Sequence, residues 1–184
     1  MAQVSPVAVE TVLMASFLNG LPEQEARDKF LETCHSSKWA AGMVARRPFE
    51  DDAALLKGAQ EVWDSLGEED WLEAFRGHPK IGDAESLRKK YHGNSGALSS
   101  VEQSGVSGAS EEVIQALAKG NQDYEEKNGF IFIVCASGKS ASEMLEILQS
   151  RLPNGRDQEL QNAAAEQAKI TALRLQKLGA SAQL

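Results

Sequence analysis

The stretch FIFIVCA, residues 130–136, resembles a helix less than any other part of the chain and therefore constrains the fold most. Its length, its β-branched residues and the flanking Gly129 and Gly138 favour a buried extended segment. The sequence offers no second segment that could pair with it in a sheet. Its backbone N–H and C=O groups must then find partners in loops, helix ends or a ligand. Packing in the core without any ligand is an equally open interpretation, because apolar runs are usually buried for packing.

The remainder of the chain is patterned as helices separated by proline, glycine and serine. Prolines in the first turn and serines at the cap position mark helix starts, and glycines mark several ends. Predicted helices start near Ser5 and Pro22, and others cover residues 36–48, 49–67, 68–77, 110–127, 140–152 and 157–179. The sequence therefore predicts an all-α fold, a single compact multi-helix domain over residues 1–184 with one short buried extended segment at about 130–136.

The composition fits one ordinary globular domain. The 184 residues are 42% hydrophobic and 25% charged, which is typical of a chain that buries a core. A net charge of -8 and a pI near 5.0 argue against a nucleic-acid groove or an anionic membrane surface, since both need clustered Lys and Arg. We expect the ligand to be a small molecule or another protein.

The cysteines and the chain ends bear on location. Cys34 and Cys135 lie far apart, without a CxxC pair or a Cys/His cluster, so we expect no metal site and a reducing intracellular setting. The N-terminus lacks the pattern of a secretory signal, and no run approaches the ~18 apolar residues of a membrane span. The final SAQL shares only its leucine with a peroxisomal targeting tripeptide. These features predict a soluble protein.

His78 stands between Gly77 and Pro79, directly after a predicted amphipathic helix. Because a proline restricts the residue before it to extended or turn geometry, the imidazole is held on a stiff corner, where it could move protons near neutral pH. A structural interpretation is also open, since a histidine at a helix end interacts favourably with the helix dipole. His35 follows another helix end and His92 lies in a glycine-rich loop, and we expect both to be exposed and incidental.

Arg174 is unusual because the last predicted helix places it inside an apolar sector. At 100° per residue, that sector also holds Gln167 and the apolar residues Leu160, Ala163, Ala164, Ile170, Leu175 and Leu178. One interpretation is that the arginine lays its stem along the core and reaches water. The other is that the guanidinium stays inside and meets an anion, because burying it unpaired is costly and its planar fork matches a carboxylate.

The Gly- and Ser-rich stretch 91–110 is interpreted as an ordered surface loop that leads to a short helix. It contains SSVEQ, which could form one helical turn capped by Ser99, with Glu102 at the third helical position as in a capping box. Spacing in the sequence does not show which side chains meet in space, so no catalytic triad is inferred. The residues alone indicate an all-helical soluble domain in which His78, Glu102 and Arg174 are candidates for one pocket.

Several motifs together resemble the 2-oxo-4-hydroxy-4-carboxy-5-ureidoimidazoline (OHCU) decarboxylases, enzymes of urate and purine catabolism. These motifs are WLEAFRGHPKIGD, SSVEQSGV, NQDYEEKNGFIFIVCASGKSASEMLEILQSRL and EQAKITALRL, and HSSKWAAGMVARRPF is similar to the family's early tryptophan and Arg-Pro-Phe segment. The resemblance covers about residues 5–178. A similar domain forms the first half of plant allantoin synthase, a transthyretin-like protein in which a hydroxyisourate hydrolase follows. Between Gly82 and Ser99 this chain departs from the family by being a few residues longer.

The resemblance implies a carboxy-lyase that converts OHCU to (S)-allantoin without metal or organic cofactor. Loss of CO2 leaves an electron pair that delocalises into the neighbouring C=N bond, and the enol-like species must then be protonated on one face. The family's catalytic histidine matches His78, while Glu102 would orient the imidazole or take the substrate hydroxyl proton, and Arg174 would hold the leaving carboxylate or a ring oxygen. The substrate-binding residues that the resemblance implies are Pro79, Ser99, Glu102, Gln103, Phe132, Ile133, Val134, Cys135, Ala136 and Arg174, with 132–136 acting through main-chain groups.

Two other functional classes compete with this interpretation. A helical binding or scaffold module with a degenerate pocket fits the acidic composition, but it gives no reason for His78, Glu102, Gln103 and Arg174 to occur together. A thiol-dependent peroxidase on a similar helical fold requires a CxxC pair that this chain lacks. For a decarboxylase, the resemblance further implies a homodimer, a fused or associated hydroxyisourate hydrolase as partner, and a location in the peroxisome or the cytoplasm.

Overall fold

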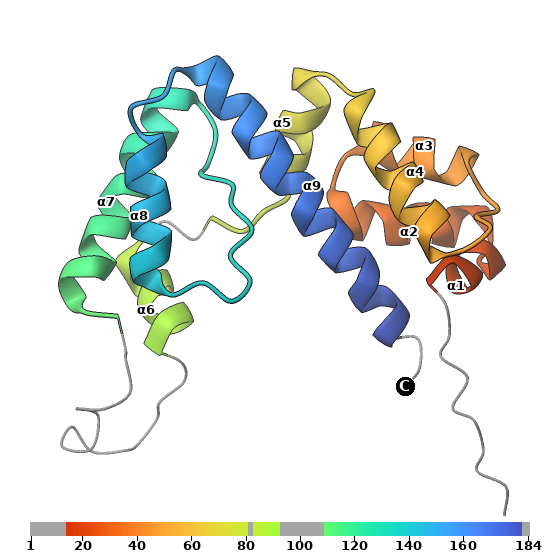
Figure 1. The fold of residues 1–184 in the computed structure, drawn as a ribbon, viewed down its shortest axis with the longest axis horizontal. Coiled ribbons are helices and arrows are strands. Elements are labelled where there is room, and N and C mark those ends of the chain that lie inside the picture. Colours follow the sequence, from red (N-terminus) through yellow and green to blue (C-terminus); the bar gives the residue numbers. More distant parts are fainter. Residues whose placement is uncertain (1–13, 81–82, 93–108, 182–184) are drawn as a thin grey trace, which may run out of the picture. The chain divides into compact units, whose positions relative to one another are not determined.

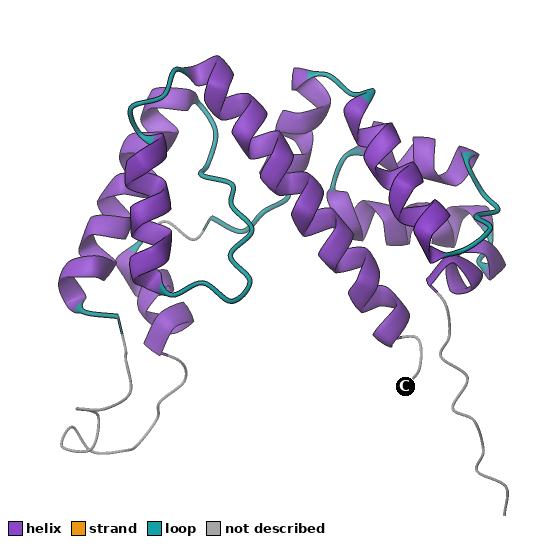
Figure 2. Ribbon diagram, in the orientation of Figure 1, coloured by secondary structure: helices purple, strands orange, loops and turns teal. Residues whose placement is uncertain are grey.

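The computed structural model describes residues 14–80, 83–92 and 109–181, and within these ranges all regular secondary structure is helical (Figures 1 and 2). The all-α class predicted from the sequence is confirmed, whereas the helix predicted near Ser5 lies outside the described residues. The helices are α1 Met14–Gly20, α2 Glu23–Cys34, α3 Ser37–Ala45, α4 Asp52–Asp64, α5 Glu68–Arg76, α6 Ala84–His92, α7 Glu111–Asn128, α8 Ala141–Arg151 and α9 Arg156–Ser181.

Local capping explains why three of the described helices start where the sequence predicts. The hydroxyls of Ser36 and Ser110 accept a hydrogen bond from the third backbone N–H of α3 and α7, respectively. At α8 the capping is reciprocal, because Ser140 accepts from the backbone of Glu143 while the Glu143 carboxylate accepts from the backbone of Ser140. Gly129 ends α7 with a φ of 78°, a left-handed conformation that glycine adopts without steric cost.

Helix α6 was not predicted from the sequence. It occupies residues 84–92, and only its last two residues fall in the stretch 91–110 that was interpreted as a surface loop. Asp83 caps this helix, since its Oδ1 accepts from the backbone N–H of Ser86 at 2.8 Å. Leu87 is its only apolar side chain in the buried core, so a periodic apolar pattern is absent.

The described part of the chain forms two compact units. The first unit takes the residues up to Asp70 and those from Ala168 onward, and the second takes Trp71–Gln167. Each half of α9 therefore belongs to a different unit. The predicted single domain over residues 1–184 stays a prediction.

The first unit packs α1 to α4 and the C-terminal half of α9 around an aromatic core. The Phe30 ring meets the rings of Trp39 and Phe49 edge to face, with centroids 5.8 and 6.4 Å away. Trp39 is fully buried, and its indole N–H donates to the Ala59 carbonyl at 3.0 Å. A large buried aromatic ring with a satisfied N–H stabilises this unit without an unpaired polar atom.

The second unit packs α5 to α8 and the N-terminal half of α9 around Tyr124. Helices α7 and α8 approach closely at Gly120, where a Cβ atom would lie 2.7 Å from Cδ2 of Leu148. The Tyr124 ring contacts Phe130 and Phe132 edge to face, with centroids 6.0 and 5.1 Å away. These contacts place the non-helical segment that follows α7 against the core of the unit.

Residues 131–136 are not helical, as predicted, and form a connection between α7 and α8 (Figure 2). Burial along this stretch is uneven: Phe130 and Ile133 are buried, whereas Phe132 and residues 134–136 are half-buried. The predicted buried segment is thus anchored by two apolar side chains and otherwise remains partly accessible.

Candidate active site

His78 lies just beyond the end of α5, at the corner that the sequence predicts. The backbone N–H groups of Gly77 and His78 donate to the carbonyls of Ala74 and Phe75 at 3.2 and 3.1 Å, so the helical turn tightens before Pro79 ends it. The imidazole is half-buried, and Pro79 is exposed. The histidine therefore combines a rigid backbone with partial access.

The imidazole of His78 contacts α9 through a buried glutamine. Its Nε2 lies 2.6 Å from Oε1 of Gln167, a side chain that is 0% exposed. Because an amide oxygen only accepts hydrogen bonds, Nε2 is the donor in this contact. Gln167 lies in the apolar sector predicted for the last helix, and its partner was not predicted. The sequence does indicate that Gln167 has a partner, because a polar side chain in an apolar sector is normally hydrogen-bonded.

The segment 132–136 is held mainly by side chains. The backbone N–H of Cys135 donates to Oε2 of Glu166 on α9 at 2.7 Å, and its carbonyl accepts from Nζ of Lys139 at 2.9 Å. The carbonyl of Ile133 accepts from Nη1 of Arg151 at 2.9 Å, at the end of α8. The expectation of partners in loops and helix ends is met by Lys139 and Arg151, whereas Glu166 lies inside a helix. Binding of substrate through main-chain groups stays a prediction.

A buried polar cluster supports this segment and was not predicted. Glu159 is 0% exposed, and its carboxylate accepts from Nε of Arg151 at 2.8 Å and from the Tyr124 hydroxyl at 2.6 Å. Its other oxygen accepts from the amides of Asn154 and Asn162, each at 2.7 Å. Burial raises the pKa of Glu159, but the hydrogen bonds outweigh it, so the pKa lies below its ordinary value. Burial and the Glu159 carboxylate raise the pKa of Tyr124.

Arg174 lies in the first unit, where it is half-buried. Its Nη1 donates to the carbonyl of Thr33, at the C-terminal end of α2, at 3.0 Å. The same nitrogen lies 3.5 Å from Nδ1 of His35. A cation at a helix C-terminus interacts favourably with the carbonyl dipoles there. The arginine is thus tied to the fold, and within the described part of this unit no carboxylate forms an ion pair with it.

The expectation that His35 is exposed was wrong, whereas the expectation that it has no function stays a prediction. The residue is half-buried and adopts a φ of 62°, which is unusual for a residue with a side chain. Burial, and second the charge of Arg174, lower the pKa of His35 below its ordinary value of 6.5. The sequence showed only that His35 follows a helix. Its neighbour Arg174 lies 139 residues further along the chain.

The predicted binding turn with Ser99, Glu102 and Gln103 lies outside the described residues, as does the side chain of His92. The described ranges contain no group of three or more His, Cys, Asp or Glu residues arranged to hold a metal ion. None of the helices in those ranges is long and apolar enough to cross a membrane.

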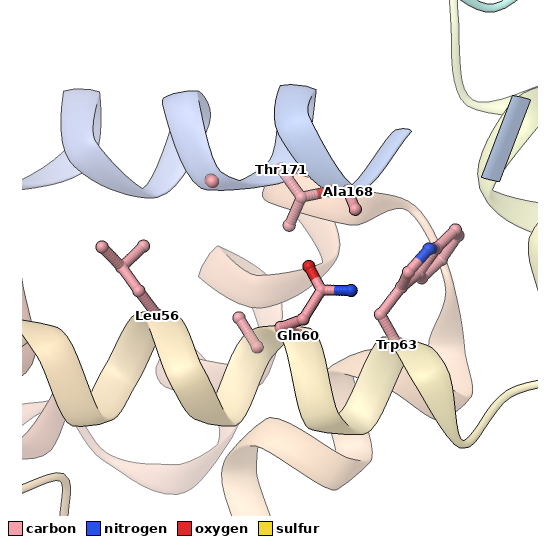
Figure 3. A pocket seen from close by; sticks show the side chains of 7 residues that line it. Leu56, Gln60, Trp63, Ala168 and Thr171 are labelled. Carbon is pink, nitrogen blue, oxygen red and sulfur yellow. The ribbon is translucent and has the colours of Figure 1, made fainter. Parts of the chain in front are cut away.

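One shallow pocket in the first unit does not suit the predicted chemistry. Leu56 and Gln60 of α4 point toward Thr171 and Ala168 of α9, with Trp63 beside them (Figure 3). The remaining lining residues are Ala59 and Ala172. Since no lining side chain titrates near neutral pH, this pocket cannot supply an acid or a base for catalysis.

Comparisons with known proteins agree with the motifs. The family model described as OHCU decarboxylase matches residues 19–176. The uric acid degradation bifunctional protein TTL of Arabidopsis thaliana is 39% identical over 153 residues, which are 82% of this chain and 46% of that protein. The 2-oxo-4-hydroxy-4-carboxy-5-ureidoimidazoline decarboxylase of Halalkalicoccus jeotgali is 25% identical, over 91% of this chain and 93% of its own.

A solved structure extends the comparison to the fold. The crystal structure of OHCU decarboxylase in the presence of (S)-allantoin superposes with a TM-score of 0.65 at 36% identity. The match covers 83% of this chain and 98% of that one. The chain thus spans about half of the plant relative and nearly all of the solved decarboxylase.

Proposed function

The chain belongs to the OHCU decarboxylase family, and we propose that it converts OHCU to (S)-allantoin in urate degradation, as a carboxy-lyase without metal or organic cofactor. The observation that carries this proposal is the half-buried His78, set on a rigid corner and hydrogen-bonded to the buried Gln167 at 2.6 Å. A scaffold module has no need for a titratable group that is oriented in this way. A decarboxylase that must protonate one face of an intermediate does.

The reaction requires the protein to transfer protons, because the substrate itself accepts the electron pair that is released. As the C–C bond to the carboxylate breaks, its electron pair moves toward the neighbouring C=N bond of the substrate, and CO2 leaves. One proton is consumed for each carboxylate lost. An imidazole that titrates near neutral pH can supply the proton and recover it from solvent. We assign this role to His78, with Glu102 orienting the ring or taking the substrate hydroxyl proton.

We assign substrate binding to one residue for the carboxylate and to a second group of residues for the ring and the ureido group. Arg174 would hold the carboxylate, because its planar guanidinium matches two carboxylate oxygens. Main-chain groups of residues 132–136, together with Pro79, Ser99 and Gln103, would hold the ring and ureido groups. The hydrogen bonds of Glu166 to the Cys135 N–H and of Arg151 to the Ile133 carbonyl support this assignment only in that they hold the segment in place.

The activity is tested by circular dichroism. Urate is converted with urate oxidase and hydroxyisourate hydrolase, so that OHCU forms in the cuvette, and the ellipticity of allantoin is followed with and without this protein. We expect a single-handed allantoin signal that grows faster when the protein is present. A time course that the protein leaves unchanged would favour the helical scaffold module instead.

Assembly and location are proposals that rest on the family resemblance. We propose a homodimer, which light scattering after size-exclusion chromatography would detect as twice the 19.9 kDa chain mass. The bifunctional plant relative supports a hydroxyisourate hydrolase as a fused or associated partner. For the compartment we propose the peroxisome or the cytoplasm, which a fluorescent fusion of the full chain would distinguish.

A further inference from the structure

Two successive residues of α9 hold two separate parts of the candidate site. Oε2 of Glu166 accepts from the backbone N–H of Cys135 at 2.7 Å, and Oε1 of Gln167 contacts Nε2 of His78 at 2.6 Å. Neighbouring residues of a helix point about 100° apart, so one turn of α9 can face both stretches. The same turn therefore fixes the segment predicted to bind substrate and the histidine predicted to move protons.

The contact of Gln167 has a chemical consequence for His78. A neutral imidazole carries its proton on one nitrogen and a lone pair on the other, and the hydrogen bond at one nitrogen decides which. The amide oxygen of Gln167 can only accept, so it favours the form with the proton on Nε2. Full burial of Gln167 makes the loss of this bond costly, because the amide would be left without water to replace it.

We propose that Gln167 is a positioning residue, which keeps the proton of neutral His78 on Nε2 and so makes Nδ1 the nitrogen that exchanges protons with the substrate. This inference rests on the proposed function. The Nδ1 lone pair takes up a proton and returns it from the same atom, while the Nε2–H bond stays intact. Gln167 itself gains and loses no proton, and it acts only through His78.

The tautomer of His78 can be read directly by 15N NMR of the full chain without substrate. The His78 signals are assigned by their loss in His78→Asn. We expect wild-type His78 at high pH to be protonated on Nε2. In Gln167→Met, which keeps the bulk but removes the acceptor, the Nδ1-protonated form should appear. In Gln167→Glu, which retains an acceptor, the Nε2-protonated form should persist.

Kinetics with OHCU show whether the tautomer matters for the reaction. Gln167→Met should lower kcat about 10- to 100-fold, the size expected for a lost hydrogen bond to a reacting group, with a smaller change in KM. Gln167→Glu should restore part of that loss. Gln158→Met serves as the matched control, because Gln158 is an exposed glutamine of the same helix, and its kcat should equal that of the wild type.

Three results would overturn the proposal: a wild-type His78 protonated on Nδ1, a Gln167→Met variant with the wild-type tautomer, or one with wild-type kcat. If Gln167→Met does not fold, the wild-type and Gln167→Glu spectra still decide which nitrogen is protonated. A wild-type protein without decarboxylase activity would remove the proposed function but leave the tautomer result standing. The two failures are therefore distinguishable.

Discussion

Arg151 is a buried arginine of α8, and Arg174 is a half-buried arginine of α9. They differ in whether a carboxylate lies beside the guanidinium. Arg151 is 8% exposed and meets the carboxylate of Glu159, which is fully buried. Arg174 is half-buried and meets a carbonyl and an imidazole, both uncharged acceptors. The charge of Arg151 is thus balanced within the protein, whereas the described part of the first unit offers Arg174 no carboxylate. We infer that the first arginine stabilises the fold, and on the family resemblance we propose that the second binds an anionic ligand.

The largest expected effect in this comparison is on stability at Arg151. Arg151→Met would leave Glu159 buried without its cation, and loss of one partner of a buried pair typically costs about 3–5 kcal/mol of unfolding free energy. Urea denaturation followed by far-UV circular dichroism measures this cost. The double variant Arg151→Met with Glu159→Leu should recover part of the loss. A single variant as stable as the wild type would show that the pair does not hold this unit together.

Arg174 should show the opposite behaviour, with lost binding and a retained fold. Arg174→Lys keeps the charge but loses the two-pronged fork, so substrate binding should weaken by about 1.5–3 kcal/mol, as for a lost charge-assisted hydrogen bond. Arg174→Met should abolish binding, while the lost hydrogen bond to the Thr33 carbonyl should lower the free energy of unfolding by only about 1 kcal/mol. If Arg174→Met instead lost as much stability as Arg151→Met and kept its KM, the comparison would fail.

The decrease in the free energy of unfolding at acidic pH should depend in part on Glu159. Its pKa is lower in the folded protein than its ordinary value of 4.5, so its stabilising contribution is complete above pH 4.5 and is lost as the pH falls through the folded pKa. Urea midpoints measured in steps below pH 4.5 should therefore fall in the wild type. Glu159→Gln should be less stable at neutral pH and should lose part of this slope. An unchanged slope would assign acid unfolding to other carboxylates.

The smallest effect concerns His35 beside Arg174. The folded pKa of His35 lies below its ordinary value of 6.5, so its contribution to stability is complete above pH 6.5 and decreases as the pH falls below it. Arg174→Met removes the second cause of this shift and should move the pKa of His35 upward, while burial keeps it below 6.5. NMR titration of the ring signals measures this change. No movement would mean that the two side chains are not coupled in solution.

Local signals predicted the parts of the fold that depend on local chemistry. Ser110 and Ser140 cap their helices as expected, because a cap involves only residues a few positions apart. Helix α6 was not predicted, because its charged sequence has one buried apolar side chain, Leu87, and no periodic apolar stripe. The position of His78 at the end of α5 was likewise predicted from Pro79, whose effect reaches only its neighbour.

Long-range pairings could not be predicted in the same way. The contact of His78 with Gln167 joins residues 89 positions apart, and no local rule relates them. The apolar sector of the last helix singles out Arg174, but its partner Thr33 lies 141 positions away. Which polar groups meet inside the protein depends on how helices pack, and that information is spread over the whole chain.

The most direct measurement of the central claim compares wild type and His78→Asn in the circular dichroism assay that starts from urate. We expect the variant to remain folded, with a melting temperature lowered only by the lost hydrogen bond to Gln167, and to form single-handed allantoin no faster than the reaction without protein. His92→Asn, a histidine with no assigned role, is the matched control and should retain wild-type activity. A folded His78→Asn variant with full activity would contradict the account, because the proton would then come from another group.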